Sequence, residues 1–127
     1  MLKLLMHYRT VWEDYFTGNQ TLFQTKEYET RQTPSDTGVY ILNCLFRSIS
    51  SSSSGGALYC SDSVQYFLVE SSSFFSCKTS ISGGAIYFIN TNNGQYVLQG
   101  VCGYDCSSTS GGNAPFSYNQ VYDVVSS

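Results

Sequence analysis

The amino-acid sequence predicts an all-β fold, a right-handed parallel β-helix of about three rungs with an N-terminal cap. The first observation behind this prediction is a repeated unit. Gly-Gly-Ala-Leu-Tyr occupies 55–59, Gly-Gly-Ala-Ile-Tyr occupies 83–87, and a degenerate Gly-Gly-Asn-Ala follows at 111–114. The Gly pairs, which begin at 55, 83 and 111, therefore recur at a constant period. A Ser-rich loop of varying length precedes each pair, and a fixed period with the variation confined to one loop is typical of stacked repeats.

A second observation is that aromatic residues upstream of the Gly pairs also recur at a constant period. The period from Phe46 to Phe75 and from Phe75 to Tyr104 is one residue longer than that of the Gly pairs. Such a period accommodates three short strands and three bends, which is one turn of a parallel β-helix, and the apolar residues alternate with a strand-like period of two. The strands predicted in successive copies are 39–42, 67–70 and 95–99, then 44–48, 73–77 and 102–106, and finally 56–60, 84–89 and 113–118.

Length and composition indicate one domain with a distinct N-terminal segment. The chain has 127 residues, a formal net charge of −3, 12% charged residues and 16% aromatic residues. The acidic balance argues against a nucleic-acid partner, which requires a basic face, and the low charge with abundant aromatics argues against disorder. A turn-forming stretch at 33–38 separates a cap, residues 1–37, from the repeats. The repeats are placed at 38–127, as a first copy at 38–66, a second at 67–95 and a third at 96–127.

Alternation along the second strand of each copy predicts which side chains form the core. Successive side chains of a strand point to opposite faces. Phe46 and its equivalents Phe75 and Tyr104 are therefore expected to lie inside and to contact one another. Phe74, beside Phe75, is expected to point outward.

The Gly pairs and the residues after them predict a corner and an outer aromatic ladder. Glycine allows positive φ and close backbone approach, so the pairs are expected at sharp corners that define the rungs. Leu58 and Ile86 are expected inside, which places Tyr59 and Tyr87 on the outer surface, one rung apart. Stacked Tyr rings offer contact area with free hydroxyl groups, so these two are the candidate ligand-contacting residues, although cross-strand stacking alone also explains them. The corner pairs are Gly55 and Gly56, Gly83 and Gly84, and Gly111 and Gly112.

The five Cys residues predict no zinc site. Cys102 and Cys106 are four residues apart with no His beside them, which disfavours zinc ligation. Buried free thiols that behave as small hydrophobes are the simplest interpretation. Cys77 and Cys106 occupy equivalent positions of adjacent rungs, about 4.8 Å apart at the usual strand spacing. That separation permits a disulfide, and it also permits unbridged stacking.

The sequence contains no evident catalytic, cofactor-binding or metal-ligating pattern. Carboxylates in the repeats include Asp62, Glu70 and Asp105, whose spacing does not predict the acid pair of a glycosidase. The only His, His7, precedes the repeats, which disfavours a Ser–His or Cys–His nucleophile. The Gly pairs lack the Lys and the helix of a phosphate loop. We therefore expect a protein that is not an enzyme and that holds no cofactor and no metal.

The N-terminal segment carries weaker signals. Residues 1–6 are apolar except for Lys3, a run too short for a complete secretory signal. No stretch approaches the roughly 18 apolar residues of a membrane-spanning helix, so no transmembrane segment is expected. Residues 11–16 form a short amphipathic piece, and Asn19-Gln20-Thr21 is a glycosylation sequon that matters only in a secreted chain.

The repeated motif resembles a known family. Gly-Gly-Ala-Leu/Ile-Tyr, each time after a Phe-x-Ser/Cys element, is similar to the polymorphic outer-membrane-protein repeat, whose GGAI and FxxN motifs lie on a right-handed parallel β-helix. The Asn of FxxN is absent here, because Ile49 and Lys78 stand at that position, and Pro115 interrupts the third copy. The chain looks more closely like Ser/Tyr/Cys-rich proteins of trichomonad protists, over residues 36–112. The segments that carry this likeness are 36–40, 43–46, 74–77 and 100–106.

This resemblance implies an interaction protein that is secreted or displayed at the cell surface. We accordingly predict a module for adhesion or surface display, with a host surface protein or glycan as its partner, and we make no prediction of oligomeric state. One alternative is a fragment of a carbohydrate-active β-helix enzyme, similar to a polysaccharide lyase or hydrolase. Another is a piece of a longer array without a role of its own. Further GGAIY repeats in a longer reading frame favour the surface role, whereas an Asp cluster on a neighbouring rung favours the enzyme.

Overall fold

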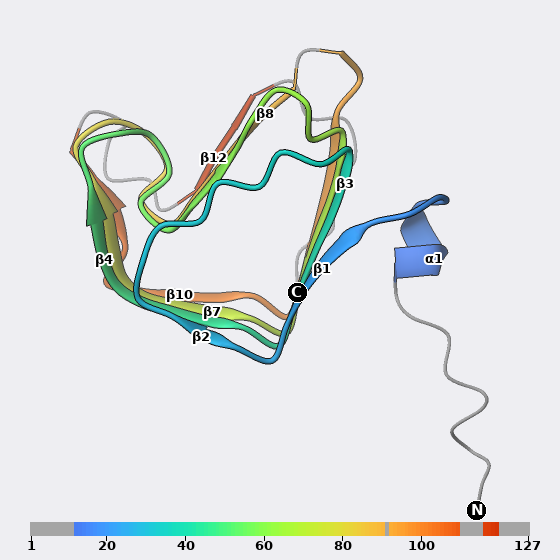
Figure 1. Ribbon diagram of the computed structural model, residues 1–127. Helices are drawn as coiled ribbons and strands as arrows, with labels where there is room; N and C mark the ends of the chain where they lie inside the picture. Colours follow the sequence, from blue (N-terminus) through green and yellow to red (C-terminus); the bar gives the residue numbers. More distant parts are fainter. Residues whose placement is uncertain (1–11, 91, 110–115, 120–127) are drawn as a thin grey trace, which may run out of the picture.

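Parallel β-sheets account for most of the regular secondary structure in the described chain (Figure 1). The computed structural model describes residues 12–90 and 92–109, together with the backbone of 116–119. Within these residues three sheets are formed, and their strand pairings are parallel. The predicted all-β class and the predicted parallel pairing are therefore confirmed.

The first sheet contains the first strand of each copy. Its strand order is β1-β3-β6-β9. Val39 pairs with Phe67, at the period of the Gly pairs, and Phe67 pairs with Tyr96, at the period that is one residue longer. The predicted first strands are correct to within one residue. The strands are β1 (Thr21–Gln24), β3 (Gly38–Leu42), β6 (Tyr66–Glu70) and β9 (Gln95–Gln99).

The second and third sheets contain the later strands of each copy. The second sheet has the order β10-β7-β4-β2, with β11 also paired to β7, and the third has the order β12-β8-β5. Figure 1 shows the equivalent strands of each sheet lying over one another around a common interior. The second sheet contains β2 (Glu27–Tyr28), β4 (Leu45–Ser51), β7 (Ser73–Thr79), β10 (Cys102–Tyr104) and β11 (Ser107–Ser108), and the third contains β5 (Leu58–Cys60), β8 (Ile86–Ile89) and β12 (Phe116–Asn119).

One hydrophobic cluster with members from all three sheets forms the core. At its centre the rings of Tyr28, Phe46 and Phe74 stack, with centroids 4.9 Å apart for the first pair and 4.8 Å for the second, and with interplanar angles of 14° and 5°. Leu58 and Ile86 are fully buried in the same cluster, as predicted. The stacked rings therefore join three successive strands of the second sheet from the inside.

Two of the predicted core aromatics lie on the outside, so this part of the prediction was wrong. Phe75 is 43% exposed and Tyr104 is 69% exposed. Their rings meet edge-on at 5.9 Å, away from the core. Phe46 is buried as predicted, but its partner in the sheet is Phe74, which was expected to point outward and is fully buried.

A bend in the second-sheet segment of each copy explains the error. Within each of the segments 45–51, 73–79 and 102–108, one residue has φ between +52° and +57°, and this left-handed conformation breaks the alternation of side chains. Two consecutive residues, Phe75 and Ser76, therefore face away from the core before Cys77 returns to it. Because Phe74 and Phe75 are adjacent, an aromatic residue stands opposite Phe46 whether the period is that of the Gly pairs or one residue longer. Aromatic stacking alone therefore does not distinguish the two periods. The bent positions are Ser48, Ser76 and Asp105.

The glycine pairs form corners, as predicted, wherever the structure describes them. The first glycine of each pair has positive φ, +76° at Gly55 and +72° at Gly83, a conformation that costs other residues free energy. The second glycine allows close approach between copies. A Cβ atom on Gly56 would lie 2.0 Å from the carbonyl oxygen of Gly84. A Cβ atom on Gly84 would lie 2.4 Å from the carbonyl oxygen of Ser107 in the following copy. The predicted third pair, Gly111 and Gly112, lies outside the described residues.

The segment predicted as a cap contributes a helix and two strands. β1 and β2 pair in parallel with β3 and β4, at one edge of their sheets. The short helix α1 (Trp12–Tyr15) lies against the face of the first sheet that points away from the core (Figure 1). The first sheet is thus buried on both faces. The second cluster that covers it contains Trp12, Phe16, Tyr40, Leu68 and Val97.

Candidate binding groove

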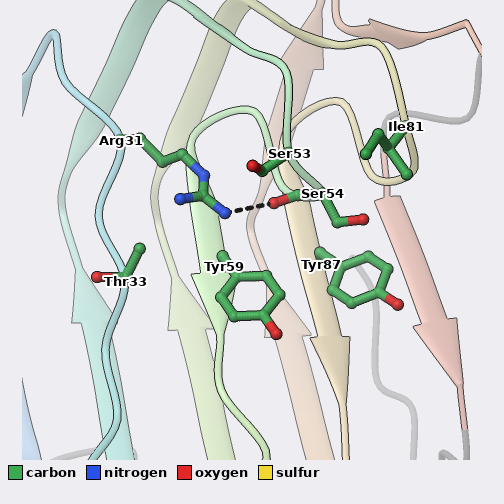
Figure 2. Close-up of a pocket in the computed structure, with 7 residues that line it drawn as sticks. All are labelled: Arg31, Thr33, Ser53, Ser54, Tyr59, Ile81 and Tyr87. Atoms are coloured by element: carbon green, nitrogen blue, oxygen red, sulfur yellow. Dashed lines mark hydrogen bonds between the residues drawn. The ribbon is translucent and has the colours of Figure 1, made fainter.

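Tyr59 and Tyr87 form a stacked pair on the outer face of the third sheet, which we call the Tyr pair. The two residues are register partners in β5 and β8. Their ring centroids are 5.6 Å apart and the ring planes differ by 10° (Figure 2). Both side chains are half-buried, so part of each ring contacts solvent. The predicted stacking is confirmed, whereas a ligand-contacting role stays a prediction.

Arg31 lies beside the Tyr pair, and its positively charged guanidinium group contacts the Tyr59 ring. The guanidinium carbon is 5.2 Å from the centroid of the Tyr59 ring, a cation–π distance. Nε donates to the carbonyl of Gly55 at 2.9 Å. Nη2 donates to the carbonyl of Ser54 at 2.8 Å, and Figure 2 shows this second bond. These bonds fix the end of the first Ser-rich loop against the side chain. Arg31 therefore links the N-terminal segment, the loop and the aromatic pair.

An open groove of about 520 Å³ runs along these side chains (Figure 2). Its surface combines aromatic rings, hydroxyl groups and one cation. Pockets that bind small molecules typically combine apolar surface with a few placed polar groups, and a ring face beside several hydroxyls suits a ligand that has both an apolar face and polar edges. The lining residues are Arg31, Thr33, Ser53, Ser54, Tyr59, Ile81 and Tyr87.

Sequence reasoning identified the Tyr pair but missed the rest of the groove. Arg31 and Thr33 belong to the segment that was predicted only as a cap. Gln32 forms a parallel bridge with Leu58, and this long-range pairing places its neighbours beside the Tyr pair. Ile81, 42% exposed, comes from the second Ser-rich loop. No local pattern marks these residues, since their proximity depends on how separate segments stack.

The three carboxylates considered for catalysis lie in or next to strands of three different sheets. Glu70 ends β6 in the first sheet, Asp105 follows β10 in the second, and Asp62 follows β5 in the third. Asp105 accepts a hydrogen bond from the Ser76 hydroxyl at 2.9 Å and pairs with the Lys78 ammonium at 3.5 Å. The hydrogen bond from Ser76, and then the charge of Lys78, lower the pKa of the Asp105 carboxyl. These three residues therefore do not form the acid pair that glycoside hydrolysis needs.

Metal-ligating side chains do not gather in the part of the chain that the structure describes. No group of three or more His, Cys, Asp or Glu residues there could hold a metal ion. His7 lies outside the described residues. All five thiols are free. Cys44, Cys60 and Cys77 are buried, Cys106 is half-buried and Cys102 is exposed.

A second, smaller groove of about 290 Å³ lies beside the sequon. Asn19 in this groove is exposed, and the hydroxyl of Thr21, the third residue of the sequon, donates to the carboxylate of Asp36. Glycosylation of Asn19 stays a prediction.

Comparisons with known proteins do not place this chain in a family. No family model matches it, and no curated protein or solved structure matches it either. Within the described residues, no helix combines the length and the apolar character needed to cross a membrane.

Proposed function

We propose that this chain is a right-handed parallel β-helix that acts, without enzymatic activity, as a module for adhesion or surface display. The parallel pairing of equivalent strands from successive copies in the first two sheets supports this architecture. So does the Gly corner, because at Gly56 and Gly84 a Cβ atom would collide with the backbone of the next copy. The resemblance to the polymorphic outer-membrane-protein repeat and to the trichomonad Ser/Tyr/Cys-rich proteins supports the same proposal. On this basis the protein is secreted or held at the cell surface.

The single observation that carries the functional proposal is the groove along the Tyr pair. Tyr59 and Tyr87 are held by the sheet and by each other, so binding a ligand costs little side-chain entropy. Arg31 is likewise held by two backbone carbonyls. A rigid surface of rings, hydroxyls and one cation suits a glycan or a polar protein surface. We therefore propose a host glycan or surface protein as the partner.

The enzymatic alternative has less support. Asp62, Glu70 and Asp105 lie in or beside three different sheets, whereas a site that hydrolyses a glycosidic bond needs two carboxylates that flank this bond. The groove itself is lined by Arg31, Ser, Thr, Tyr and Ile side chains, without an acid among them. A binding role is the better match to that chemistry.

The test removes both rings and measures binding. The double variant Tyr59→Ser, Tyr87→Ser should keep its β-sheet circular dichroism spectrum and should lose binding to a glycan array and adhesion to a panel of cultured mammalian cells. The matched control is Phe75→Ser, Tyr104→Ser, which removes the other exposed aromatic pair on the outer surface. Unchanged binding by the folded Tyr variant, or equal loss in both variants, contradicts the proposal.

A further inference from the structure

We propose that Cys77 and Cys106 form a disulfide that links the second copy to the third when the protein meets a small-molecule disulfide such as oxidised glutathione. Cys77 lies in β7, and β10 and β11 both pair with that strand. Phe75 is opposite Tyr104, and Lys78 is opposite Ser107. Cys106 therefore lies opposite Cys77. This proposal does not depend on the function of the Tyr pair.

The geometry of the two thiols suits a bridge. Neighbouring register positions of paired strands lie about 4.8 Å apart, and Cα separations of roughly 4.4–6.8 Å accommodate a disulfide. The Cys77 thiol donates to the carbonyl of Phe46 at 3.6 Å, and the Cys106 thiol donates to the carbonyl of Phe74 at 3.2 Å. Both thiols thus point back toward the preceding copy in the same way.

The pair is selected by register from the five cysteines. Cys102 is opposite Ser73, and Cys60 is opposite Phe88. The backbone N–H of Cys44 donates to the hydroxyl of Ser72 at 3.0 Å, in the equivalent position of the second copy. The residue opposite each of these three cysteines is therefore not a cysteine. Cys77 and Cys106, by contrast, lie opposite each other.

The two thiols also differ in reactivity, and this difference determines which of them reacts first. When Cys106 is a thiolate, the Cys77 thiol can donate its hydrogen to it in place of a backbone carbonyl, and this hydrogen bond lowers the pKa of Cys106 to about 7. The same hydrogen bond, together with burial, raises the pKa of Cys77. Cys106 is half-buried and Cys77 is buried. Because the thiolate is the nucleophile, Cys106 is the thiol that reacts first with a reagent from solvent.

The reaction is a balanced thiol–disulfide exchange. The Cys106 thiolate attacks one sulfur of the small disulfide, which forms a mixed disulfide at Cys106 and expels one small thiolate. Cys77 then loses its proton to solvent and attacks Sγ of Cys106, which forms the Cys77–Cys106 bond and expels the second small thiolate. The two protein thiols are oxidised by two electrons, and the reagent is reduced to two thiols. The bridge closes a loop over residues 78–105.

The test maps the bond in the full-length chain. The reduced protein is treated with oxidised glutathione, and its free thiols are counted. We expect the count to fall from five to three, with a mass loss of two hydrogen atoms and no retained glutathione. Cleavage after Lys78 separates Cys77 from Cys106, while cleavage after Phe75 and Tyr104 isolates each from the remaining cysteines, so a linked pair of peptides identifies the bond. Five remaining thiols, or any other pairing, overturns the proposal.

Two variants and one pH comparison complete the test. Cys106→Ser should retain all four of its thiols, whereas the matched control Cys102→Ser should still lose two of its four. With a pKa of about 7 at Cys106, the exchange should be about tenfold faster at pH 8 than at pH 6, because the rate follows the thiolate fraction. An ordinary thiol with a pKa of about 8.5 gives a nearly hundredfold rise, and that result overturns the assignment of Cys106 as the first nucleophile. Loss of two thiols in Cys106→Ser overturns the pairing itself.

Discussion

Replacing Phe74 with Ala should destabilise the protein far more than the same change at Phe75, one residue away. Phe74 is fully buried, and its ring stacks on Phe46 at 4.8 Å with nearly parallel planes. Its other register neighbour is Gly103, which has no side chain that could move into the space left by the ring. The variant therefore creates a cavity at the end of the internal stack. Phe75, by contrast, is 43% exposed.

The expected magnitudes follow from these two environments. For Phe74→Ala the lost transfer free energy and the cavity add, which gives about 3–5 kcal/mol. For Phe75→Ala only the covered part of the ring counts and no closed cavity forms, so about 1 kcal/mol is expected from the usual 1.5–3 kcal/mol for complete burial. For a chain of this length, 1 kcal/mol corresponds to a shift in Tm of roughly 3–5 °C. The two variants should thus differ in Tm by roughly 6–20 °C.

Thermal and urea unfolding followed by far-UV circular dichroism would measure both variants beside the unchanged protein. Equal m values would show that the two changes act on stability rather than on the extent of unfolding. If Phe75→Ala lowers Tm as much as Phe74→Ala, the register that pairs Phe46 with Phe74 is incorrect. The same result would restore the register predicted from Phe46, Phe75 and Tyr104.

Two further substitutions test the helix contact and the bend. Gly38→Ala places a Cβ atom 3.0 Å from the Trp12 ring and 2.6 Å from the Asn19 carbonyl oxygen. Helix α1 should therefore detach, and the fluorescence emission of the only Trp should shift to the red. The control is Ser35→Ala at an exposed position, which should leave the emission unchanged. A normal emission maximum in Gly38→Ala contradicts this packing. Ser48→Gly should raise the unfolding free energy by about 0.5–1 kcal/mol, because φ is +56° there and a left-handed residue other than glycine costs about 1–2 kcal/mol, partly offset by the entropy of glycine. Ser50→Gly, in the same strand without positive φ, should lower it by about 0.5–1 kcal/mol, and the same sign for both changes in urea unfolding would contradict the bend.

The features predicted correctly are those that depend on neighbours in the chain. Glycine at a corner with positive φ is a local requirement, so Gly55 and Gly83 could be assigned from their own motif. Alternation after the corner placed Leu58 and Ile86 inside, and it placed the Tyr pair outside. No bend interrupts β5 or β8, so alternation held there.

The second sheet shows where local reasoning fails. Serine rarely adopts a left-handed conformation, so the residue type of Ser76 does not predict its positive φ. The break in the alternation of side chains between Phe74 and Cys77 therefore could not be predicted from the local sequence. The groove presents the same difficulty. Arg31 reaches Tyr59 only because Gln32 pairs with Leu58, and nothing near Arg31 in the chain predicts that pairing.

The sequence alone therefore determined the repeat period, the corners and the alternation of the third strand, because each follows from the conformational preferences of a few adjacent residues. The tertiary structure decided which member of the Phe74–Phe75 doublet is buried, because stacking on Phe46 and the bend at Ser76 have to be satisfied together. It also decided that α1 covers the first sheet. These outcomes depend on contacts between residues far apart in the chain, whose free energies no single stretch of sequence contains.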